Sequence, residues 1–185
     1  MPKLIKPSVK AQPIRLYICS PLAPYTISDE RPARRSFRCP FGSKKVTFKA
    51  NLKLAIGYAK AIWLASNGHF WPILPHVQFP YITEKQDSDP KIRNLSFSYL
   101  KSFFENKMID RILVVGDYIS TGMMSEILWA YSLGIPVLYI HYADLMDEDF
   151  LPSRLVTSSP VKLKWLLDMT YQSAEAKKLA RAFKE

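Results

Sequence analysis

The chain has 185 residues, of which 48% are hydrophobic and 13% are aromatic. This composition supports one domain with a substantial core and excludes an intrinsically disordered chain. No hydrophobic run approaches the roughly 20 residues of a membrane-spanning helix, and the basic N-terminus lacks the hydrophobic stretch of a signal peptide. We therefore expect a cytoplasmic protein without a membrane partner.

The net charge of +10 is concentrated in the N-terminal third. Residues 1–60 hold 13 lysine and arginine residues and 2 acidic residues, a net charge of +11, whereas the other 125 residues hold 13 and 14, a net charge of −1. The densest basic part is residues 29–49. Such a segment attracts phosphate, on a small nucleotide or on nucleic acid, and it is equally consistent with a solvated surface.

The first half of the chain predicts an arm, a strand, a loop and a helix. Residues 1–12 form a flexible basic arm in which prolines oppose regular structure, and residues 14–22, IRLYICSPL, predict the first strand. Residues 23–46 form a long basic loop, of a length typical of functional lids or disordered segments. A helix follows from Asn51, because hydrophobic residues recur at three- and four-residue spacing until an Asn-Gly pair stops it.

The second half continues the alternation of strands and helices. HFWPILPHV, residues 69–77, predicts a second strand, and a helix is expected over about 91–107. DRILVVGD, residues 110–117, predicts the third strand. A helix over about 121–133, ended by a glycine, and the strand PVLYIHY, residues 136–142, come next.

This alternation is the pattern of an α/β protein. We expect a Rossmann-like or flavodoxin-like parallel sheet of four to five strands with helices on both faces, followed by one or two C-terminal helices over about 160–184. The predicted domains are the arm at 1–12, an α/β domain at 13–145 that includes the basic loop, and a C-terminal helical extension at 146–185.

Polar residues follow the predicted strands where such a fold places its ligand. In an open parallel sheet, ligands bind beyond the carboxyl ends of the strands. The first strand ends near Tyr17 and Ser20, the second near His76, and the third at Gly116 and Asp117. These residues are therefore expected at one edge of the sheet.

The segment after the third strand predicts an anion-binding helix start. Ser120, Thr121, Gly122 and Met123 open a helix, whose N-terminus offers N–H groups, hydroxyls and the positive end of the helix dipole. Glu126 is expected on the first exposed turn, where it either presents a carboxylate to a bound group or only stabilises the helix start. The three histidines and two cysteines form no metal-ligand pattern, so we expect free thiols, no metal and no cofactor.

Four segments together resemble one enzyme superfamily. They are YICSPL, the asparagine that opens the first predicted helix, PILPHV, and GDYISTGMMSEILWAYSLGIPV. The pattern S-x-G-M/A-x-x-E-x-x-x-A followed by a Gly-Ile-Pro-Val strand is similar to the nucleoside 2-deoxyribosyltransferase superfamily, above all to its small phage and bacterial relatives. That superfamily includes the 2'-deoxynucleoside 5'-phosphate N-hydrolases. The resemblance covers about residues 14–142.

The resemblance implies a mechanism and the residues that perform it. By position, Glu126 is the nucleophile that attacks C1′ of the sugar, expels the base and forms a glycosyl-enzyme ester, which water or another base resolves. Ser120 stands six residues before it, where the nucleotide hydrolases carry a serine that contacts the 5′-phosphate and the nucleoside transferases carry an aspartate. Tyr17 matches the tyrosine that ends the first strand in the family. Ser20 falls in the turn under the sugar, and His76 corresponds to a histidine that faces the ligand.

The chain departs from the family on the second predicted helix. Active members carry an aspartate there that orients the base or protonates the leaving group, and this segment has none. Asn94, Ser96, Ser98 and Tyr99 are the available substitutes, and Asp117 is a candidate for the acid that equally suits a turn cap. Loss of general acid catalysis costs about 10²- to 10⁴-fold in rate, which favours substrates whose base leaves readily or a pure binding role.

Three functions follow from these observations. The first is an N-glycosidase or deoxyribosyltransferase acting on a nucleotide or nucleoside, with a homodimer or higher homo-oligomer implied by the resemblance. The second is a nucleotide-binding module that senses or sequesters its ligand without cleaving it. The third is a nucleic-acid-binding protein driven by the basic N-terminal third, although no nucleic-acid-binding motif accompanies it.

Overall fold

The computed structural model describes residues 12–21, 25–26, 45–46, 48–75, 90–140 and 159–183. Within the predicted basic loop it describes only β2 (Tyr25–Thr26) and β3 (Lys45–Val46), which pair in antiparallel fashion. The predicted arm, except its last residue, the rest of that loop, and His76 lie outside the described residues.

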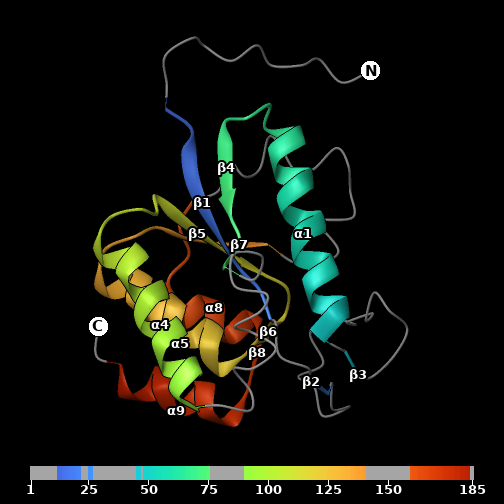
Figure 1. The fold of residues 1–185 in the computed structure, drawn as a ribbon. Helices are drawn as coiled ribbons and strands as arrows, with labels where there is room; N and C mark the ends of the chain where they lie inside the picture. Colours follow the sequence, from blue (N-terminus) through green and yellow to red (C-terminus); the bar gives the residue numbers. More distant parts are fainter. Residues whose placement is uncertain are drawn as a thin grey trace.

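A four-stranded parallel sheet forms the centre of the protein (Figure 1). Its strands are β1 (Ile14–Cys19), β4 (Phe70–Ile73), β5 (Arg111–Val115) and β7 (Val137–Ile140), in the order β4-β1-β5-β7. All three pairings are parallel. The predicted α/β class and the predicted parallel sheet are thereby confirmed.

Helices cover both faces of this sheet, as expected (Figure 1). One face packs against α1 (Phe48–Ala65). The other face packs against α4 (Pro90–Glu105), α5 (Thr121–Ser132), α8 (Leu163–Met169) and α9 (Ala174–Ala182). The C-terminal helices predicted from the sequence are thus present as α8 and α9.

The predicted helix ends are confirmed, whereas one predicted helix start is wrong. Asn67 and Gly68 end α1 with φ angles of 49° and 76°, and Gly134 follows α5 with a φ of 67°. A left-handed residue after the last turn is a common way to end a helix. The start of α1 is Phe48 rather than Asn51, and Asn51 is buried within the first turn.

Alternation along β1 divides the core into two halves. Tyr17 and Cys19 point to the face that carries α5, whereas Leu16 and Ile18 point to the face that carries α1. All four side chains are fully buried, because β1 has a strand on each side and helices over both faces. Tyr17 and Cys19 therefore reach the same side of the sheet as α5.

Two short strands join the C-terminal segment to the end of β5. β6 (Tyr118–Ile119) follows β5 and pairs in parallel with β8 (Tyr171–Gln172). Leu166 and Ala176 are fully buried in the same hydrophobic cluster as Tyr17. The sequence predicted the helices of this segment but not its pairing with β6.

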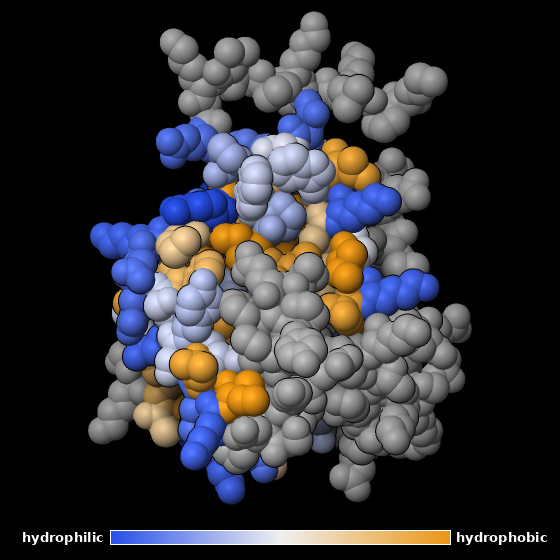
Figure 2. All heavy atoms as spheres, in the orientation of Figure 1, coloured by the Kyte–Doolittle hydropathy of each residue, from blue (hydrophilic) through white to orange (hydrophobic). Residues whose placement is uncertain are grey.

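The surface near α1 and β4 carries exposed hydrophobic side chains. Ile56, Trp63, Leu64 and Trp71 are each more than a third exposed, and the rings of Trp63 and Trp71 meet in a T-shaped contact with centroids 5.4 Å apart. On the face shown in Figure 2, hydrophobic and strongly hydrophilic side chains alternate. Within the described ranges, no helix combines the length and hydrophobicity that a membrane crossing requires.

Candidate functional site

The strand order reverses between β1 and β5. The chain passes from β1 to β4 on one side, crosses back to β5 on the other side of β1, and continues to β7. In open parallel sheets, ligands bind at the carboxyl ends of the two strands where this reversal occurs. Ser20 follows β1 and Gly116 follows β5, so two of the segments predicted to bind a ligand meet at the switch point.

The helix α5 starts at this edge with Ser120 as its N-cap. The Ser120 hydroxyl accepts a hydrogen bond from the N–H of Met123 at 3.4 Å. The N–H groups of Thr121 and Gly122 belong to the same first turn, for which a helix has no internal acceptors. The predicted anion-binding segment is therefore a capped helix N-terminus at the switch point.

Residues from α4 and from the C-terminal segment flank the start of α5. A Cβ atom at Gly122 would lie 3.3 Å from Cζ of Phe97 on α4, so a glycine suits this close approach. On another side, Oγ1 of Thr121 lies 3.2 Å from Oγ of Ser173, the N-cap of α9. The start of α5 is thus held between two other parts of the fold.

Glu126 lies inside the protein, on the second turn of α5. Its side chain is 6% exposed, and Oε2 has no hydrogen-bond partner among the described residues. Burial raises the pKa of Glu126 to about 7, while the nearby Cys19 thiol and Tyr17 hydroxyl favour the charged form and act in the opposite direction. The expectation of an exposed turn is wrong, because the side of α5 that carries Met123, Glu126 and Ile127 faces the core.

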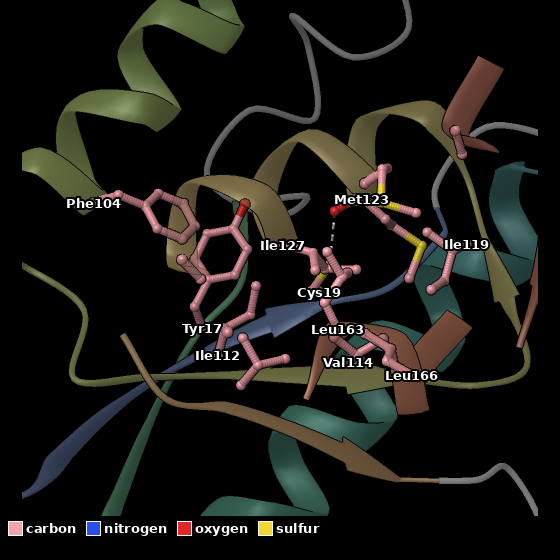
Figure 3. Close-up of a cluster of buried hydrophobic side chains, with 14 of the residues drawn as sticks. Tyr17, Cys19, Phe104, Ile112, Val114, Ile119, Met123, Ile127, Leu163 and Leu166 are labelled. Atoms are coloured by element: carbon pink, nitrogen blue, oxygen red, sulfur yellow. Dashed lines mark hydrogen bonds between the residues drawn. The ribbon is translucent and has the colours of Figure 1, made fainter. Parts of the chain in front are cut away.

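Two side chains from β1 accompany this carboxylate. The Tyr17 hydroxyl points toward α5 and has no hydrogen-bond partner within the described ranges (Figure 3). The Cys19 thiol donates to the carbonyl oxygen of Met123, with Sγ and O 3.9 Å apart. Burial and then the charge of Glu126 raise the pKa of both Tyr17 and Cys19 well above their ordinary values. Both groups therefore stay protonated at neutral pH beside Glu126.

Asp117 is engaged in the fold of the turn between β5 and α5. Its Oδ1 accepts a hydrogen bond from the Tyr139 hydroxyl of β7 at 2.9 Å. Its carbonyl oxygen accepts another from the N–H of Tyr171, at 2.6 Å. These contacts suit the turn-anchoring alternative for Asp117.

The candidate substitutes for the missing acid of α4 lie in different environments. Ser96 is buried and its hydroxyl donates to a backbone carbonyl of its own helix. Asn94, Ser98 and Tyr99 are exposed. The acidic residue that α4 does contain, Glu105, forms an exposed ion pair with a lysine of the same helix. The described side chains of α4 thus contribute no buried carboxyl group near Glu126.

No sequence pattern indicated that Tyr139, Tyr171 and Ser173 lie near the site. Ser173 carries a recognisable signal, since a serine before a helical segment predicts an N-cap, but no local pattern places it beside Thr121. Across the described ranges, no group of three or more histidine, cysteine, aspartate or glutamate side chains is arranged to hold a metal ion.

The fold and the site define a Rossmann-like α/β domain with a flavodoxin-like strand order and a buried carboxylate behind a capped helix start. Residues 15–140 match the model of a family described as "Domain of unknown function (DUF7768)", and the chain belongs to this family. The match covers most of the chain and ends before the C-terminal segment. No curated protein and no solved structure matches the chain.

Proposed function

We propose that this protein cleaves the N-glycosidic bond of a nucleotide or nucleoside, with Glu126 as the nucleophile. The observation that carries the proposal is the buried Glu126 carboxylate, whose Oε2 lacks a partner in the described part of the chain. Burying a carboxylate without full hydrogen bonding is costly, and such perturbed groups gather at functional sites. The resemblance of residues 120–130 to the nucleoside 2-deoxyribosyltransferase superfamily supports the same role.

The proposed reaction has two steps. The ionised carboxylate of Glu126 attacks C1′, a carbon–oxygen bond forms, and the base leaves with the electron pair of the broken C1′–N bond. Water or an acceptor base then attacks C1′ and releases Glu126 as a carboxylate. With a pKa of about 7, roughly half of the Glu126 side chains are ionised at neutral pH, and the donors on Tyr17 and Cys19 favour that form.

The start of α5 is the proposed binding site for a phosphate or for sugar hydroxyls. The Ser120 hydroxyl and the N–H groups of Thr121 and Gly122 lie at the positive end of the helix dipole. A serine at position 120, rather than the aspartate of the nucleoside transferases, favours a nucleotide. Ser20, Met123 and His76 are proposed to complete the pocket, as the resemblance implies.

A second function is favoured by the arrangement of the acids. The described part of α4 places no carboxyl group near Glu126, and Oδ1 of Asp117 accepts from Tyr139. Without a proton donor, departure of a poor leaving group slows by about 10²- to 10⁴-fold. The alternative is therefore a nucleotide-binding module without turnover. The nucleic-acid-binding hypothesis depends mainly on the basic loop, most of which lies outside the described residues.

A base-release assay tests these functions against each other. Purified full-length protein is incubated with nucleosides, 5′-mononucleotides and dinucleotides, and free base is followed by chromatography. We expect release from a 5′-mononucleotide, loss of release in Glu126→Gln, and unchanged release in Glu105→Gln, an exposed acid on α4. Saturable binding of one compound without base release in the wild type would favour the binding module.

We also propose that the protein is a cytoplasmic homodimer or higher homo-oligomer. Exposed Trp63 and Trp71 support self-association, because aromatic side chains are enriched in protein interfaces. Light scattering coupled to size-exclusion chromatography measures the mass directly. A monomeric mass at all concentrations tested would contradict this part of the proposal.

A further inference from the structure

The C-terminal segment, residues 159–183, meets the same turn that starts α5. This segment lies beyond the region that matches the family, which ends at residue 140. Its strand β8 pairs with β6, the two residues directly before the Ser120 cap. The proposed substrate-binding turn is therefore built from two parts of the chain about 50 residues apart.

Backbone hydrogen bonds hold these two parts in register. The N–H of Tyr171 donates to the carbonyl oxygen of Asp117 at 2.6 Å, and the N–H of Ser173 donates to that of Ile119 at 3.1 Å. One bond lies at the residue just before β6 and the other at the last residue of β6, so together they span the strand. They limit the movement of the turn that leads into α5.

The Ser173 side chain connects the starts of two helices. Its Oγ lies 3.2 Å from Oγ1 of Thr121 and accepts a hydrogen bond from the N–H of Ala176 at 3.1 Å, which caps α9. Because β6 and β8 are parallel and each leads into a helix, α5 and α9 both start at this edge (Figure 1). One hydroxyl thus links the N-cap of α9 to the first residue of α5.

Further contacts anchor the segment to the body of the protein. The rings of Tyr118 and Tyr171 stack with centroids 6.0 Å apart, and the Lys177 ammonium lies 5.3 Å from the Tyr171 ring centroid. Leu166 and Ala176 are fully buried against the core. The segment is therefore fixed firmly enough to hold another group in place.

We propose that the C-terminal segment positions the substrate-binding start of α5, with Ser173 as a positioning residue that orients the Thr121 hydroxyl. The inference rests on the proposed function, because it takes residues 120–123 as the binding turn. A hydroxyl and two N–H groups bind a ligand more tightly when they are already held in the binding geometry, since less conformational freedom is lost. Ser173 touches the turn and not the reacting atoms, so it acts on binding more than on the chemical step.

The test compares Ser173→Ala with Ser173→Thr and Glu175→Gln. Threonine retains a hydroxyl and is itself a good N-cap, whereas Glu175→Gln weakens the first turn of α9 without touching Thr121. For Ser173→Ala we expect faster hydrogen exchange of the Met123 and Met124 amides, which bond to Ser120, and a KM raised about 2- to 10-fold with kcat changed less. Ser173→Thr restores both quantities, and Glu175→Gln resembles the wild type.

Two further outcomes separate this inference from the proposed function. If no compound in the panel is cleaved, the proposed function fails, and the exchange rates of the Met123 and Met124 amides alone decide whether Ser173 positions the turn. If base is released but Ser173→Ala matches Glu175→Gln in exchange and in KM, the positioning role is overturned while the glycosidase stands.

A second variant covers the case in which Ser173→Ala does not fold. Thr121→Val removes the other hydroxyl of the pair and leaves the α9 cap intact. We expect it to accelerate exchange of the Met123 and Met124 amides in the same way. Unchanged exchange in Thr121→Val would contradict the inference.

Discussion

Tyr17 on β1 and Glu126 on α5 are both buried and each shifts the pKa of the other, yet the Tyr17 hydroxyl and Oε2 of Glu126 each lack a hydrogen-bond partner in the part of the chain that the structure describes. An unsatisfied buried polar atom costs about 1–3 kcal/mol, so a fold without a use for these groups would be more stable with apolar ones. A ligand that bonds to either atom would recover part of that energy. The pair is the strongest structural support for a binding function.

Glu126→Gln should remove a loss of stability that the wild-type protein undergoes as pH rises. The pKa of Glu126 is about 7 in the folded protein against an ordinary value of 4.5, so the folded state binds more protons between these pH values. The contribution of Glu126 to stability is therefore fully present below about pH 4.5 and is lost as pH rises through 7, by about 3 kcal/mol in total. Glu126→Gln removes this fall. Urea denaturation at pH 5 and pH 8 measures it, and an equal pH dependence in both proteins would contradict the burial of this charge.

Tyr17→Phe should raise the pKa of Glu126 further. The hydroxyl favours the charged carboxylate, so its removal moves the pKa of Glu126 upward from about 7. Nuclear magnetic resonance of the Glu126 carboxyl carbon measures this titration without any substrate. At pH 5, where Glu126 is protonated, the unfolding free energy should rise by about 1–3 kcal/mol, because the buried hydroxyl has no hydrogen-bond partner to lose among the described residues. Tyr99→Phe, on the exposed face of α4, is the matched control and should leave the titration unchanged.

Gly122→Val should destabilise the start of α5 through Phe97. An added Cβ lies 3.3 Å from Cζ of Phe97, and a valine adds two methyl groups beyond it. Phe97 has little room to retreat, because its ring packs edge-on against Trp129 with centroids 6.0 Å apart. We expect a loss of about 1–3 kcal/mol in the free energy of unfolding. In a Phe97→Leu background the loss should be smaller by at least about 0.5 kcal/mol, whereas equal losses in both backgrounds would exclude this contact as the cause.

Asp110→Asn should weaken the fold slightly and leave base release unchanged. Asp110 accepts from Arg15 through Nη2 at 2.7 Å, Nε at 3.0 Å and the backbone N–H at 2.8 Å, at the edge of the sheet opposite to the site. Both side chains are more than a third exposed, so we expect a loss of only about 1 kcal/mol at neutral pH.

The pH dependence of this pair has the opposite sign to that of Glu126. The hydrogen bond from Arg15 lowers the pKa of Asp110, so its contribution is present above the ordinary pKa and is lost as pH falls through the lowered value. Urea denaturation at pH 7 and pH 3 should show the difference between wild type and Asp110→Asn shrinking at the lower pH. A difference that stays constant would indicate that the charge contributes nothing.

The order of elements could be predicted from local patterns. Hydrophobic spacing indicated α1, α4 and α5, and Asn67, Gly68 and Gly134 marked the helix ends, because a left-handed residue is a requirement of the turn itself. The parallel sheet followed from the alternation of strands and helices. The serine that caps α5 could also be recognised locally, because serine is a preferred residue directly before a helix.

Only the tertiary structure decided which side of α5 is buried. The helix TGMMSEILWAYS is hydrophobic on nearly every side, since it contacts the sheet, α4 and α9 at once, so no periodic pattern could show that Glu126 faces the core. The same holds for the partners of Asp117 and Thr121, which come from β7 and from the start of α9. Local patterns mark the order of the main helices and strands and where the helices end, whereas contacts between distant segments depend on how the whole chain packs. In this protein that packing sets the burial of Glu126 and brings Ser173 beside Thr121.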